Sequence, residues 1–191
     1  MMTRGSQIAD GWPDESREAA KLVIQSYGEP DEATEHELVW YECGPWKRIV
    51  ASKEFHTHNF PAPHTDSVEC FIAYRVPPEK FSALAEFDGS VMVDRTAGEV
   101  SARCHDEQAN FLALNLMHDI VSGNKSVEEA RRYYAKEFAD YRRKTPTPYM
   151  QGLRFSPADV DAADPDERIL SDEDLAAAKR EGEAKGDTAQ S

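Results

Sequence analysis

Basic residues are scarce in this chain of 191 residues. Only 22 Lys and Arg stand against 36 Asp and Glu, which gives a formal net charge of -14. Nucleic acids and anionic membrane surfaces attract basic proteins and repel acidic ones. We therefore expect no nucleic acid and no membrane among the partners of this protein. An unknown protein or small molecule stays open as a partner, and so does the oligomeric state.

Cysteines are also few, and long apolar runs are absent. The three cysteines are Cys43, Cys70 and Cys104, and no two of them have CxxC spacing. This odd number argues against a disulfide framework and favours a reducing compartment. No apolar run approaches the ~20 residues of a membrane helix, and the first twelve residues lack the apolar core of a signal peptide. We expect a soluble, cytoplasmic protein.

The distribution of charged and aromatic residues predicts the domain organisation. Hydrophobic residues make up 40% of the chain, which is enough for a packed core. Residues 156–191 contain eleven acids, four bases and no aromatic residue, a composition typical of disorder. We predict a flexible lead-in over residues 1–12, a single α+β domain over residues 13–155 and a disordered acidic tail over residues 156–191.

Hydrophobic periodicity and turn residues predict the elements of the domain. The expected helices cover residues 14–27, 78–87, 106–122 and 126–144, and the expected strands cover residues 38–42, 46–53, 68–76, 91–96 and 99–104. Residues 56–66 contain two prolines and are expected to form a loop. The fold class is therefore α+β. An antiparallel-rich sheet of about five strands should pack with an N-terminal helix and a C-terminal αα-hairpin.

Histidines are concentrated in the predicted loop. Three of the six histidines, His56, His58 and His64, lie within nine positions, and Asp66 follows them. If the preceding strand continues through His58, His56 and His58 lie on the same side of it. Imidazole and carboxylate groups are ligands of zinc and other divalent metals. The segment therefore suggests a site for a divalent metal such as zinc, and the alternative is a polar surface loop.

Cys104 is a second candidate because it directly precedes a predicted helix that begins near Asp106. Free amides at a helix N-terminus stabilise a thiolate, which would suit a nucleophile. However, Cys104 also continues the apolar face formed by Val100 and Ala102 of its strand. This alternation favours a buried, unreactive thiol, with Asp106 as the cap of the helix.

The sequence contains no complete catalytic constellation, and no catalytic residue can be assigned from it. We therefore expect a non-enzymatic binding or accessory module. The alternative is a small metal-dependent enzyme that uses the histidine-rich segment 56–66. The two hypotheses differ in what they require of the structure: a binding module needs an exposed apolar patch, and an enzyme needs a concave site that holds the histidines.

Overall fold

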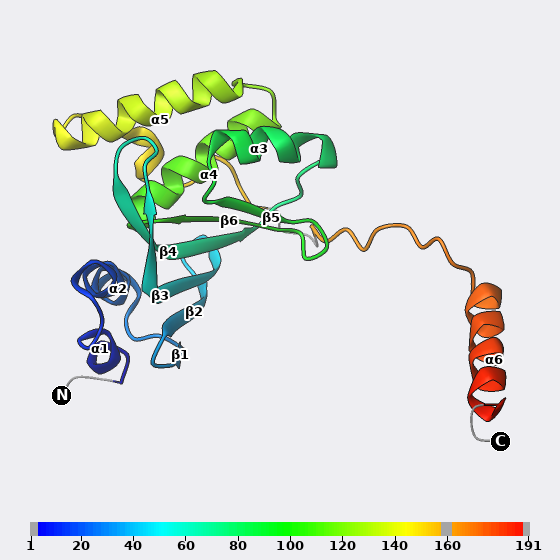
Figure 1. Cartoon of the computed structure of the whole chain (residues 1–191). Helices are drawn as coiled ribbons and strands as arrows, with labels where there is room; N and C mark the ends of the chain where they lie inside the picture. The colour runs from blue at the N-terminus through cyan, green and yellow to red at the C-terminus, as the bar shows by residue number, and fades with distance from the viewer. Residues whose placement is uncertain (1–3, 158–161, 189–191) are drawn as a thin grey trace.

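The computed structural model of the chain describes residues 4–157 and 162–188 (Figure 1). The predicted lead-in and tail also include residues 1–3, 158–161 and 189–191, which lie outside the described residues.

The centre of the molecule is a six-stranded antiparallel sheet with the strand order β1-β2-β3-β4-β6-β5. The strands are β1 (Glu32–Ala33), β2 (Glu37–Cys43), β3 (Trp46–His58), β4 (His64–Ala73), β5 (Val91–Asp94) and β6 (Glu99–Cys104). All five predicted strands are present, and the two-residue β1 is added at one edge. The prediction of an α+β fold is therefore confirmed.

Two helices pack against one face of the sheet. Helix α2 (Asp14–Tyr27) has the predicted bounds and ends at Gly28, whose φ of 82° suits glycine. It contacts β3 and β4, while α4 (Glu107–Val121) contacts β4, β5 and β6. Alternate strand residues such as Ile49, Cys70 and Ala102 are buried on this face and form one core with both helices.

A further layer of helices covers α4. Helix α5 (Val127–Arg142) begins with a capping box, in which Ser126 and Glu129 satisfy each other's backbone amides. It packs on α4 and on α3 (Phe81–Phe87), which follows the short 3-10 helix η1 (Pro78–Lys80). A second 3-10 helix, η2 (Pro148–Met150), returns the chain to α4. The αα-hairpin of α4 and α5 is thus present as expected.

The hairpin of β3 and β4 is longer than predicted. The prediction that residues 56–66 form a loop is wrong at both ends, because β3 continues to His58 and β4 begins at His64. In this hairpin His58 lies directly opposite His64, and His56 lies directly opposite Asp66. A register shift between Ala51 and His56 breaks the period-2 pattern, so the sequence alternation does not reveal the extended pairing.

Both ends of the described chain carry helices. Helix α1 (Arg4–Ala9) lies within the segment expected to be a flexible lead-in, and Ala9 and Trp12 are buried in the core. At the other end, α6 (Asp172–Thr188) stands well apart from the rest of the molecule (Figure 1). None of the described helices is long and apolar enough to cross a membrane.

Candidate functional site

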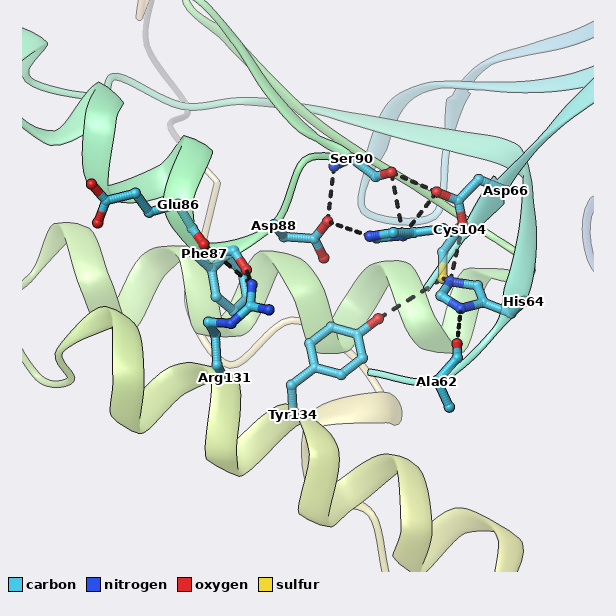
Figure 2. A network of polar contacts seen from close by, with 11 residues as sticks. Ala62, His64, Asp66, Glu86, Phe87, Asp88, Ser90, Cys104, Arg131 and Tyr134 are labelled. Atoms are coloured by element: carbon cyan, nitrogen blue, oxygen red, sulfur yellow. Dashed lines mark hydrogen bonds and ion pairs between the residues drawn. The ribbon is translucent and has the colours of Figure 1, made fainter. Parts of the chain in front are cut away.

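The β3–β4 hairpin brings three potential metal ligands together. His58 at the end of β3 lies opposite His64 at the start of β4, and Asp66 follows on the same strand. One ligand atom from each of these residues can be chosen such that all three atoms lie within 4.8 Å of one another. Other elements surround this triad with the polar side chains of Asp88, Ser90, Cys104 and Tyr134 (Figure 2).

Phe60 anchors the tip of the hairpin to helix α5. Its ring centroid lies 5.0 Å from that of Tyr134 and 6.4 Å from that of Phe87. The guanidinium carbon of Arg131 lies 3.9 Å from the centre of the Phe60 ring. Arg131 is itself held by the carbonyl oxygens of Glu86 and Phe87, to which it donates hydrogen bonds (Figure 2). The loop between the two histidines is therefore packed in place.

His64 presents its Nε2 atom to Asp66. Its Nδ1 atom lies 2.8 Å from the carbonyl oxygen of Ala62. A carbonyl oxygen can only accept a hydrogen bond, so Nδ1 carries the hydrogen, and in the neutral ring Nε2 keeps its lone pair. Nε2 lies 3.1 Å from Asp66 Oδ1. A lone pair and a carboxylate oxygen this close repel each other unless a proton or a metal cation lies between them.

His58 contacts the other oxygen of Asp66, and its outer nitrogen faces a carboxylate at a longer distance than a hydrogen bond. Its Nδ1 atom lies 3.1 Å from Asp66 Oδ2, and its Nε2 atom lies 3.7 Å from Asp88 Oδ1. A carboxylate beyond the outer ring nitrogen is the usual means by which proteins orient a metal-binding histidine. Each imidazole therefore has one nitrogen directed at an outer acceptor and the other at Asp66.

Asp66 is the central anion of the site and is only 1% exposed. Ser90 Oγ donates a hydrogen bond to its Oδ2 atom. Its Oδ1 atom has no hydrogen-bond donor with suitable geometry among the described residues. Burial alone would raise the pKa of Asp66, but its pairing with His64, the Ser90 hydrogen bond and the nearby imidazoles lower it below the usual value. Asp66 is thus an ionised carboxylate whose Oδ1 atom faces His64 Nε2 without a well-oriented hydrogen bond.

The same environment changes the pKa of His64. Burial acts to lower this pKa, yet the contact with Asp66, the bond to Ala62 and the charge of Asp88 together raise it above its ordinary value. In the absence of a metal, this raised pKa favours a proton on the His64 ring, whose Nε2 atom faces Asp66.

Asp88 is the second buried carboxylate. It lies in the turn between α3 and β5, and the backbone amide of Ser90 donates to its Oδ1 atom at 2.8 Å. Burial raises the pKa of Asp88, and the charge of Asp66 adds to this effect, while the Ser90 bond and the two histidines oppose it. The His58 ring lies between the two buried carboxylates, with one nitrogen 3.1 Å from Asp66 and the other 3.7 Å from Asp88.

Cys104 closes the cluster on the side of β6. Its Sγ atom lies 3.4 Å from His64 Nε2 and 3.8 Å from the hydroxyl of Tyr134 (Figure 2). Burial and the charge of Asp66 raise the pKa of this thiol well above its usual value. Val100, Ala102 and Cys104 are all buried, and Asp106 accepts a hydrogen bond from the Ala109 amide as the helix cap. The prediction of a buried thiol beside a capping aspartate is confirmed.

The structure brings His58, His64 and Asp66 together but places His56 elsewhere. His56 is exposed and lines an open hollow with His36, Glu54 and other polar residues on the face of the sheet that the helices do not cover. The site residues that the sequence reasoning missed are Asp88, Ser90 and Tyr134. Asp88 and Ser90 lie between α3 and β5, and no local pattern relates this turn to a hairpin more than twenty residues earlier.

Comparison of the chain with protein-family models, with curated proteins and with solved structures finds no match.

Proposed function

We propose that this protein binds a divalent transition metal through His58, His64 and Asp66, and that it is a small metal-dependent enzyme. The observation that carries the proposal is the direction of the two imidazoles. Each has one nitrogen near an outer acceptor, Ala62 O or Asp88 Oδ1, and the other 3.1 Å from a different oxygen of Asp66. This is the arrangement of a metal-binding histidine pair with its supporting shell.

The distances between the proposed ligands suit zinc. Nitrogen and oxygen ligands bound to Zn²⁺ at about 2.0–2.1 Å with tetrahedral geometry lie about 3.3 Å from one another. Asp66 is 3.1 Å from each histidine nitrogen. The ligand atoms are mutually within 4.8 Å, so binding requires only a modest approach of the two imidazoles. Iron(II) is the second metal that two histidines and one carboxylate suit.

The number of ligands favours catalysis over a purely structural role. Structural zinc sites use four protein ligands, whereas catalytic sites use three and keep one position for water or substrate. The triad of His58, His64 and Asp66 is the whole mutually close set among residues 4–157 and 162–188. Of the two hypotheses drawn from the sequence, the metal-dependent enzyme therefore has the more specific support.

Metal analysis of protein purified without an affinity tag tests the proposal. We expect one equivalent of zinc or iron per chain after exposure to the metal and gel filtration. His58→Ala and His64→Ala should each weaken binding by more than about 100-fold, because a direct ligand is lost. Asp88→Asn should weaken it by about 10–100-fold, the usual effect of removing a group that orients a ligand.

His56→Ala is the matched control. His56 lies on the same hairpin, directly opposite Asp66, but is exposed and outside the triad. This variant should bind metal like the wild type. Equal losses in the His56 and His58 variants, or no stoichiometric metal in the wild type, would show that the hairpin is not a metal site. Circular dichroism and thermal unfolding of each variant separate loss of ligand from loss of fold.

A further inference from the structure

A mainly apolar pocket of about 180 Å³ lies directly beside the proposed metal site. Its wall includes Ala109 and Met150, which are buried, and the rings of Phe138 and Tyr141 on α5. Tyr141 is 49% exposed, so the pocket opens to solvent at this rim.

The pocket reaches one member of the triad, His64, and the neighbouring Cys104. His64 and Cys104 line the pocket and also belong to the polar cluster around Asp66. The ring of Phe138 lies 6.2 Å from the ring of His64, centroid to centroid. An occupant of the pocket would therefore touch one proposed metal ligand, His64.

The size and lining of the pocket indicate what it would hold. An apolar cavity of about 150 Å³ accommodates benzene, so 180 Å³ suits one aromatic ring with a small substituent. Phe138 and Tyr141 offer ring faces, and Met150 offers a thioether, which packs well against aromatic rings.

The guanidinium and the carboxylate that line the pocket, from Arg142 and Asp106, already have partners. The Arg142 guanidinium carbon lies 3.9 Å from the centre of the Phe138 ring, and Asp106 caps helix α4. The body of the occupant is therefore uncharged, and its one polar group belongs at the inner end.

From this geometry we infer that the pocket is the substrate pocket of the proposed metal site, and that it takes a small aromatic molecule whose oxygen-bearing head group reaches the metal. The inference rests on the proposed function. It adds the class of substrate and the residues that select it: the ring is chosen by Phe138, Tyr141 and Met150, and the head group by the open position on the metal.

Two hydroxamates test the inference on zinc-loaded, full-length protein. Acetohydroxamate and benzohydroxamate share one metal-binding head group, and only the second carries a ring. We expect calorimetric titration to give about 10–100-fold tighter binding of benzohydroxamate, the factor expected for burying a ring in an apolar pocket. Metal analysis after each titration confirms that the zinc is still bound to the protein.

Two variants locate the ring. Ala109→Leu fills the pocket and should bring the ratio of the two affinities close to one, with acetohydroxamate binding unchanged. Tyr141→Ala removes one wall and should reduce the ratio by about three- to tenfold. Tyr141 is half exposed, so this change threatens the fold little. Tyr41→Ala is the matched control, because Tyr41 is 46% exposed and lies on strand β2 away from the pocket. It should leave the ratio unchanged.

The outcomes separate this inference from the metal proposal. Suppose that zinc binds in stoichiometric amount but the wild-type protein binds the two hydroxamates equally well, or that Tyr41→Ala lowers the ratio of the two affinities as much as Tyr141→Ala. The pocket then does not select a ring, and the inference is overturned while the metal site stands. If no zinc binds, the proposed function fails, and the substrate pocket fails with it.

Discussion

Replacing Phe60 by Ala should weaken both the fold and the metal site, because this side chain fixes the loop between the two histidines. Phe60 contacts Tyr134, Phe87 and the guanidinium of Arg131. An aromatic pair contributes about 0.5–1.5 kcal/mol, and a cation over a ring at a partly exposed site contributes about 0.5–1 kcal/mol. With the apolar burial of a half-buried ring, about 1 kcal/mol, we expect the free energy of unfolding to fall by about 2–3.5 kcal/mol.

Denaturant unfolding of the metal-free protein measures that loss, and calorimetric titration with zinc measures the effect on the site. We expect about tenfold weaker zinc binding by Phe60→Ala, because the freed loop must be ordered again when the metal binds. All three proposed ligands remain in this variant, so the loss would report their positioning and not their number.

Phe55→Ala is the matched control on the same hairpin. Phe55 is also half-buried but lies outside the core cluster of the described residues. It should cost less than about 1 kcal/mol and leave zinc affinity unchanged. Equal effects of the two substitutions, or full zinc affinity in Phe60→Ala, would refute the idea that the contact with α5 holds the site in place.

Three further results are expected. Pairing with Asp66 and Ala62 raises the pKa of His64 although burial opposes it. In metal-free protein this pairing stabilises the fold fully below about pH 6.5, the unfolded pKa, and the stabilisation is lost as pH rises through the raised folded pKa. A metal competes with that proton, so zinc affinity should rise over the same pH interval. Thermal unfolding across this interval should show stability falling with pH in the metal-free protein and the stabilisation by zinc growing with pH. Cys70 and Cys104 are buried, and burial raises the pKa of both thiols well above the usual value. Both should therefore react slowly with a thiol reagent in native protein and quickly in denaturant. Fast reaction of Cys104 in native protein would restore it as a candidate nucleophile. Ending the chain after Leu170 removes helix α6, which stands apart from the domain (Figure 1), and should change the free energy of unfolding by less than about 0.5 kcal/mol; a larger loss would mean that α6 docks.

Local sequence signals predicted most of the elements because the responsible interactions are local. Pro13 and Gly28 bound α2, and Ser126 with Glu129 starts α5, and each of these signals involves residues within one or two helical turns. The strands were predicted from the alternation of apolar and polar residues along each of them, which places the apolar residues on one face. Fold class was therefore readable from the sequence, since it depends on these elements and on the burial of their apolar faces.

The candidate site could be predicted only in part, because its residues come from elements that are far apart in the sequence. His58, His64 and Asp66 lie on one hairpin, and their residue types alone suggested a metal. Asp88 and Tyr134 come from other elements, and they approach the triad only through the packing of α3 and α5. His56 could not be separated from His58, because both pair with β4 in one unbroken ladder and their spacing of two predicts the same side of the strand. Only the structure shows that His56 is exposed and outside the triad.

The most direct test of the metal site is a crystal structure of the zinc-loaded protein with anomalous diffraction at the zinc edge. We expect one strong anomalous peak per chain, about 2.0–2.1 Å from His58 Nδ1, His64 Nε2 and an oxygen of Asp66. His56 should lie away from it. A peak among His36, His56 and Glu54 on the open face of the sheet, or no peak between the two strands of the hairpin, would contradict the assignment.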